Sequence, residues 1–111
     1  MNVYINNIRW KIKFTRGLSG ELQRYDGTYT IGMTDNNAKT IYLYYKLHGY
    51  LLYKVICHEL VHAYCFSYGI QLDIEEEERM ADFIATFGLD IFKKTNEIFI
   101  NMRQKQSGYG F

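Results

Sequence analysis

Alternation of apolar and polar positions dominates the first 45 residues and predicts β-strands. Apolar residues alternate with basic ones from Ile8 to Phe14 (IRWKIKF), the pattern of a half-buried strand with a basic outer face. Residues 28–34 (TYTIGMT) and 40–45 (TIYLYY) are rich in β-branched and aromatic side chains and predict two further strands. The turn-forming run 35–39 (DNNAK) lies between them, so we expect these two strands to form a hairpin.

The pattern changes to helical spacing from about Tyr50. Apolar residues then surround a helix on most sides as far as Gly69, a residue type common at helix C-termini, and this predicts a buried helix. Asp73 can cap a second helix, and Glu75–Glu78 place acids in its first turns, where the helix dipole favours them. Three strands followed by two helices predict an α+β domain.

The second predicted helix carries an apolar stripe of its own. Phe83, Phe87 and Ile91 recur at helical spacing, and we expect this stripe to pack against the first helix. Gly88 is expected to bend or break the helix, because glycine is a poor helix former. Residues 105–111 are expected to form a loose tail.

Composition places the chain among globular proteins and indicates a single domain over residues 1–111. Hydrophobic residues make up 48% and aromatic residues 17%, which excludes a disordered chain. The N-terminus lacks the features of a signal peptide, and the longest apolar stretch is too often interrupted by polar residues for a membrane span. Cys57 and Cys65 lie about 12 Å apart along the first helix, too far for a disulfide, which favours a reduced, cytoplasmic protein.

Charge is distributed unevenly along the chain, although the net charge is only +1. Residues 1–54 carry eight basic and three acidic residues, whereas residues 55–92 carry one basic and eight acidic residues. The acidic block also contains two of the three histidines, and carboxylates clustered beside histidines indicate cation binding. The simpler alternative is a solvated acidic helix face. The small net charge provides no general attraction to nucleic acid or membranes, so we expect neither partner.

The residues His58-Glu59-Leu60-Val61-His62 form an H-E-x-x-H pattern within the first helix. Residues four apart lie on one helix face, so both imidazoles can bind one ion. Glu59 lies about 100° further round the helix, where it can reach a water without ligating the metal. Two imidazoles and a carboxylate are typical zinc ligands, which predicts one Zn²⁺ per chain. The alternative is that His58 and His62 are ordinary, partly buried histidines.

A third ligand is expected from the acidic run of the second helix. Glu78 is the best candidate, and Asp82, one turn later, can accept a ring N–H from a ligand histidine and so orient it. Glu75 is the second choice for the ligand, because it shares the face of Glu78. Glu76 and Glu77 are expected to point elsewhere. Ligation by Cys65, three residues after His62, is conceivable, but buried free cysteines are common.

The two motifs together resemble the gluzincin metallopeptidases, and the chain is most similar to the small bacterial and prophage members of the ImmA/IrrE group. The pattern of that group is H-E-x-x-H followed by E-x-x-A-[ND]-x-[FI]-A, which this sequence matches at His58, Glu59, His62, Glu78, Ala81, Asp82, Ile84 and Ala85. The resemblance implies a minimal zincin-like domain, with a small three-stranded antiparallel sheet packed on an active-site helix and a second, ligand-bearing helix. It also implies one zinc ion, peptide-bond hydrolysis and a regulatory role on a prophage or other mobile element.

We therefore predict a zinc-dependent metallopeptidase that hydrolyses a protein or peptide substrate, through a metal-activated water with Glu59 as general base. We expect the substrate to add as a strand along residues 40–45. The alternative is a non-catalytic metal-binding protein that acts through protein–protein contact, a role that suits so small a chain. Nucleic-acid binding is a third possibility, which would use the basic residues Arg9, Lys11, Lys13 and Arg16.

Overall fold

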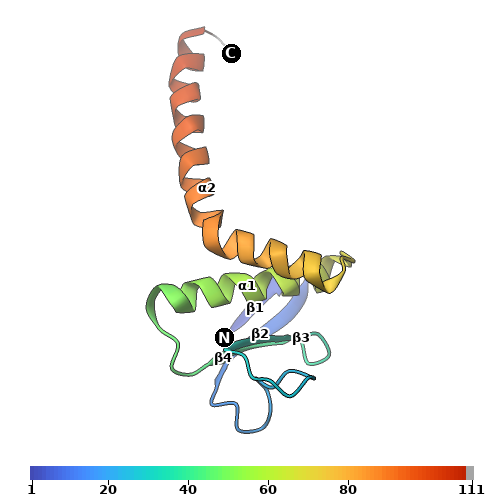
Figure 1. Ribbon diagram of the computed structural model, residues 1–111. Coiled ribbons are helices and arrows are strands. Elements are labelled where there is room, and N and C mark those ends of the chain that lie inside the picture. Colours follow the sequence, from blue (N-terminus) through green and yellow to red (C-terminus); the bar gives the residue numbers. More distant parts are fainter. Residues whose placement is uncertain (110–111) are drawn as a thin grey trace.

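The computed structural model describes the backbone of residues 1–109 and the side chains of residues 1–105. A four-stranded sheet carries one helix on its face, and a second helix lies along the first and then projects away from it (Figure 1). The α+β class is therefore confirmed. The elements in chain order are β1 (Asn2–Ile5), β2 (Ile8–Thr15), β3 (Gly32–Asp35), β4 (Thr40–Tyr44), α1 (Gly49–Tyr68) and α2 (Ile74–Tyr109).

The sheet has the strand order β1-β2-β4-β3, and it is mixed rather than antiparallel. β1 and β2 form an antiparallel hairpin, β2 and β4 are parallel, and β3 and β4 form the predicted antiparallel hairpin. The prediction of three antiparallel strands is thus wrong in two respects. β4 is the most buried strand, with Ile41 and Leu43 almost fully covered, and such a strand is most stable in the interior of a sheet, between two neighbours.

The predicted strands are found at nearly the expected positions, but one strand was missed. β2 and β4 match the predictions closely, whereas β3 begins at Gly32 instead of residue 28. The missed strand, β1, turns into β2 at Asn6 and Asn7, whose φ angles of 49° and 63° are those of a tight hairpin. A two-residue Asn-Asn turn is a recognisable hairpin signal, so this strand was accessible from the sequence.

α1 packs on the sheet through a core in which Trp10 is fully buried. The Trp10 indole Nε1–H donates a hydrogen bond of 2.7 Å to Ser67 Oγ near the end of α1, so the largest core side chain is also satisfied as a donor. α1 ends as predicted at Gly69, which adopts the left-handed conformation. The other core residues are Ile5, Ile41, Leu43, Leu47 and Ala63.

α2 begins with the predicted cap, because Asp73 Oδ1 accepts a hydrogen bond of 2.9 Å from the backbone N–H of Glu76. Its first half packs along α1 through small residues, since Ala81 and Ala85 are 0% and 5% exposed and Gly88 is buried. The predicted packing of the Phe83, Phe87 and Ile91 stripe is wrong. These three side chains are exposed, because the helix is rotated so that its small residues face α1.

The second half of α2 leaves the body of the protein. Figure 1 shows that the helix changes direction within its orange segment, which contains Gly88, and the helix remains continuous there. Of the two predicted outcomes, a bend or a break, the bend is therefore observed. α2 continues through residues 105–109 of the predicted loose tail, and residues 110 and 111 lie outside the described residues. Neither α1 nor α2, as far as Tyr109, is long and apolar enough to cross a membrane.

Candidate metal centre

Three of the predicted ligands converge where α1 meets the first half of α2. His58 and His62 lie one turn apart on α1, and their Nε2 atoms are 3.2 Å from each other. The Glu78 carboxylate of α2 faces both rings, with one oxygen 3.1 Å from His58 Nε2 and the other 2.9 Å from His62 Nε2. The three donor atoms all lie within 4.8 Å of one another, a spacing at which they could hold one metal ion.

The opposite nitrogen of each imidazole contacts a second carboxylate. His58 Nδ1 lies 2.9 Å from Asp82 Oδ1, the contact expected from the sequence. His62 Nδ1 lies 2.6 Å from Glu77 Oε2. A carboxylate that accepts the Nδ1–H selects the tautomer whose Nε2 carries the lone pair, and it holds the ring in place. In that tautomer both histidines could offer their Nε2 lone pairs to a metal ion held between them and Glu78.

The role of Glu77 corrects the sequence analysis, which expected this side chain to point elsewhere. Glu77 is only 9% exposed and contacts His62, whereas Glu75 and Glu76 are exposed. Glu77 lies one and two turns before Ala81 and Ala85, on the same side of α2. This line of small residues was the available signal for the face that packs on α1.

Glu59 is buried beside the histidines but does not belong to the group of ligand atoms. Its Oε1 accepts a hydrogen bond of 2.8 Å from the Thr34 hydroxyl of β3, and the same hydroxyl lies 3.1 Å from the Glu59 carbonyl oxygen. Burial raises the pKa of Glu59, and the hydrogen bond from Thr34 opposes that rise. Thr34 therefore fixes the orientation of the carboxylate predicted to act as a base, a role that the sequence alone did not indicate.

Gly32 allows β3 to approach α1 closely at Glu59. A Cβ atom at position 32 would lie 2.7 Å from Val55 Cγ1 and 3.1 Å from Glu59 Cγ, and the first of these distances is shorter than real Cβ contacts. Glycine thus lets the strand bring Thr34 within hydrogen-bonding distance of Glu59. This requirement also depends on the tertiary packing and was missed in the sequence.

A cleft of about 370 Å³ opens beside these groups. Its walls include Gly32 and the two residues before it, together with Glu59. β3 is an edge strand, whereas β4 is paired on both sides. The expectation that a substrate adds along residues 40–45 is therefore wrong, because β4 has no free edge, and the edge strand beside this cleft is β3. The other lining residues are Arg24, Leu51, Lys54, Val55, His58, Glu78, Asp82 and Ala85.

Cys65 does not join the candidate metal centre. The residue is buried, and burial together with its hydrogen bond to Glu77 raises the pKa of the thiol to about 11. A metal ligand has to be a thiolate, so this environment disfavours ligation. Cys57 and Cys65 are both free, as their separation predicted.

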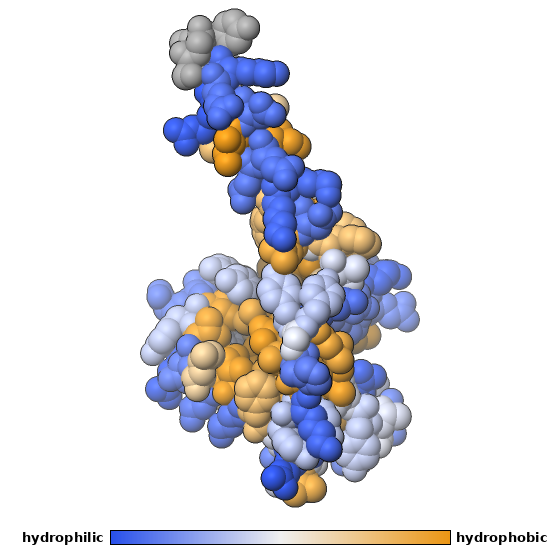
Figure 2. All heavy atoms as spheres, turned by 90° about the vertical axis from the view of Figure 1, so that its left-hand side faces the viewer, coloured by the Kyte–Doolittle hydropathy of each residue, from blue (hydrophilic) through white to orange (hydrophobic). Residues whose placement is uncertain are grey.

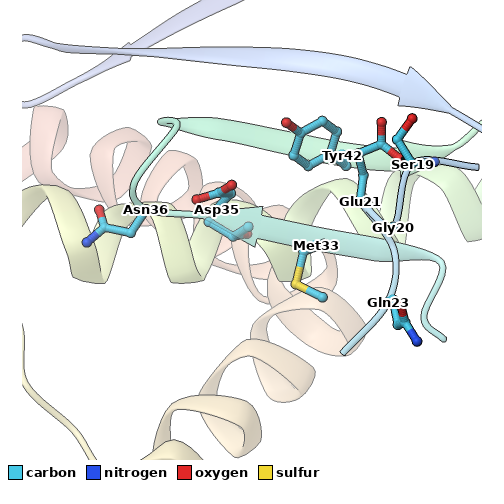
Figure 3. A pocket seen from close by; sticks show the side chains of 9 residues that line it. Ser19, Gly20, Glu21, Gln23, Met33, Asp35, Asn36 and Tyr42 are labelled. Atoms are coloured by element: carbon cyan, nitrogen blue, oxygen red, sulfur yellow. Dashed lines mark hydrogen bonds between the residues drawn. The ribbon is translucent and has the colours of Figure 1, made fainter. Parts of the chain in front are cut away.

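A second hollow, of about 470 Å³, lies between β3, β4 and the loop that precedes β3 (Figure 3). Its two carboxylates are engaged locally, because Glu21 accepts a hydrogen bond from the backbone of Ser19, and Asp35 accepts one from the backbone of Asn37. Among the described side chains, the only group of potential metal ligands with suitable spacing is that of His58, His62 and Glu78. Among the described residues, the candidate metal ligands therefore lie at the first cleft rather than at this hollow.

The donor set fits a zinc ion. Two imidazole Nε2 atoms and one carboxylate are the protein ligands of many catalytic zinc sites, in which a fourth position remains for water or substrate. Comparison with known proteins adds no assignment, since no family model, no curated protein and no solved structure matches this chain significantly.

Proposed function

We propose that this protein is a zinc-dependent metallopeptidase with a minimal zincin-like fold. One observation carries the proposal: His58, His62 and Glu78 converge on one point, while a buried carboxylate, Glu59, stands beside them outside the ligand set. A site that only binds metal needs the three ligands but has no use for a fourth, oriented carboxylate. A hydrolytic site needs such a group as its base.

Each side chain then has a distinct task. A zinc ion held by the three ligands would supply Lewis acidity, which activates a water and polarises a carbonyl group. Glu59 accepts the proton of the attacking water and delivers it to the leaving amine. Thr34 keeps the Glu59 carboxylate in position, and Asp82 and Glu77 hold the two imidazoles in the tautomer that exposes Nε2.

The substrate is a protein or peptide that binds in extended form along β3. An edge strand offers unpaired backbone groups, and an added strand would run through the cleft that Glu59 and Glu78 line. The two free cysteines support the expectation of a reducing, cytoplasmic location. A regulatory role on a prophage or other mobile element rests on the sequence resemblance alone.

A non-catalytic metal-binding protein is the second candidate. The exposed apolar side chains on the projecting half of α2 favour it, because they offer a surface for protein contact. The buried and hydrogen-bonded Glu59 favours catalysis. Burial of a carboxylate destabilises the fold, and a purely structural metal site does not require such a group.

Metal analysis and hydrolysis assays on matched variants test the proposal. The wild-type chain should bind about one zinc ion and cleave members of a quenched-fluorescence peptide library. Glu59→Gln should retain the zinc and lose hydrolysis, His62→Ala should lose both, and the exposed control Glu76→Gln should lose neither. Zinc binding without cleavage of any peptide would favour the non-catalytic candidate. Unchanged turnover in Glu59→Gln would contradict the assigned base.

A further inference from the structure

The half of α2 beyond Gly88 makes no buried contact within the described chain, since every residue from 89 to 105 is exposed. The molecule measures 61 × 30 × 28 Å, and the projecting helix accounts for its elongated shape (Figure 1). The radius of gyration is 17.6 Å, compared with about 13 Å for a compact domain of this length. A helical segment of this length without tertiary packing is only marginally stable in water, so a packing partner is expected.

The exposed surface is also larger than that of a compact monomer. The chain exposes 8348 Å², whereas a compact protein of 13.2 kDa exposes about 6400 Å². The excess of about 1900 Å² is more than the roughly 800 Å² that each partner buries in a stable protein–protein interface. The projecting helix therefore offers enough area for a specific contact.

Apolar side chains form one face of this helix. Ile91, Thr95, Ile98 and Met102 are spaced by four, three and four residues, so they lie on one line along the helix. Phe92 and Phe99 flank this line on one side. Figure 2 shows apolar side chains at the base of the projecting helix and again further along it. The five apolar members of this face are between 44% and 66% exposed: Ile91, Phe92, Ile98, Phe99 and Met102.

We propose that this face binds the same face of a second copy of the chain, with the two helices antiparallel. The spacing of four, three and four residues reads the same in both directions. In an antiparallel pair related by a twofold axis, Ile91 therefore lies opposite Met102 of the second copy, and Thr95 lies opposite Ile98 of the second copy. The line of side chains is complementary to itself.

The two flanks of the line determine the orientation. In the antiparallel twofold pair each flank meets the same flank of the other copy, which brings Phe92 next to Phe99 of the second copy. The other flank carries Asp90, Lys94, Glu97 and Lys105, whose charges alternate along the helix. An alternating row of this kind is complementary to its own reverse. Lys105 of the second copy therefore lies beside Asp90, which already forms an ion pair of 2.8 Å with Lys94, and Glu97 of the second copy lies beside Lys94.

A parallel pair would lack this complementarity. Each aromatic flank would then meet the charged flank of the other copy, and charged groups would lose hydration without gaining partners of opposite sign. The ion pairs contribute little affinity because they are exposed, but they select the orientation of the helices. The apolar line supplies the driving force.

Two isoleucines on opposite sides of the helix provide a matched test. Ile98 and Ile100 are each 56% exposed, and they point in directions about 200° apart. Analytical ultracentrifugation at tens of micromolar should show a dimer for the wild type and for Ile100→Glu, and a monomer for Ile98→Glu. The zinc content should be unchanged in both variants, which separates this result from the proposed peptidase function and confirms that the domain remains folded.

A charge swap tests the orientation. Lys94→Glu and Glu97→Lys should each weaken dimerisation about two- to fivefold, and the double variant should restore it, because the pair between the copies is re-formed with reversed signs. A wild-type chain that remains monomeric would overturn the proposal. A monomer that cosediments with anionic lipid vesicles would overturn it as well. A dimer that persists in Ile98→Glu would overturn the assigned face, and a double variant without restored affinity would overturn the antiparallel register.

Discussion

The two halves of α2 carry apolar side chains at the same helical spacing, but only the first half packs within the chain. In the first half, Ala81 and Ala85 are buried against α1, while the larger Phe83 beside them is 55% exposed. In the second half, all residues from 89 to 105 are exposed, including large side chains such as Phe92. The largest apolar side chains thus do not mark the face of this helix that is buried.

Small residues in the contact between α1 and α2 matter for the candidate site. Small side chains let two helices approach closely, and a short distance between α1 and α2 brings the carboxylates of Glu77 and Glu78 within reach of the imidazoles. If the phenylalanine stripe packed on α1 instead, the helix would be rotated and more distant, and these contacts would be lost. The second half of α2 does not pack against the rest of the described chain, and its larger side chains are available to a partner.

The largest expected effect concerns Glu78, the zinc ligand that we propose in the first half of α2. Glu78→Ala should weaken zinc binding by more than the roughly 10–100-fold cost of losing an outer partner, because it removes a direct ligand. Competition with a chromogenic chelator measures the change. The control is Glu75→Ala, an exposed acid one turn earlier, which should change little. The reverse result would show that the helix is placed one turn out of register.

A smaller effect is expected for the carboxylates that orient the histidines. Glu77→Ala and Asp82→Ala should each weaken zinc binding about 10–100-fold, because the Nδ1–H of one imidazole loses its acceptor. Glu77→Ala should be the more severe of the two, because Glu77 is buried and Asp82 is mostly exposed. The neighbouring exposed Glu76→Ala serves as the control in the same chelator assay. Equal affinities for Glu77→Ala and Glu76→Ala would contradict the role assigned to Glu77.

The packing of the first half can be tested without metal. Ala81→Leu should destabilise the domain by about 1–3 kcal/mol, because Ala81 is fully buried where α1 and α2 pack and a larger side chain would overpack this contact. Thr86→Leu, at an exposed position of the same helix, should stay within about 0.5 kcal/mol of the wild type. Urea unfolding in excess chelator measures both values. A tolerated leucine at position 81 would mean that the helices are not closely packed there.

The smallest effect is expected at the stripe that the sequence pattern favoured. Phe83→Ala should change the free energy of unfolding by only about 0.5 kcal/mol, because the side chain is exposed and its main contact is the Phe87 ring within the same helix. The same urea unfolding experiment provides the measurement. A loss of several kcal/mol would show that the stripe packs against α1 after all.

Local features of the fold could be predicted from the sequence because they depend on backbone periodicity. The spacing of four between His58 and His62 places them on one face of any helix, and Asp73 and Gly69 mark helix ends through local hydrogen bonds and backbone conformation. The β3–β4 hairpin follows from a turn of a few residues for the same reason. None of these features requires contact with a distant segment.

Tertiary structure alone decided the strand order and the rotation of α2 about its axis. Both depend on which surfaces pack most closely, and that choice involves residues far apart in sequence: Thr34 and Gly32 meet Glu59, and Glu77 meets His62. A periodic pattern identifies the faces of a helix, but the free energy of packing selects one of them, and here it selected the face with the smallest side chains.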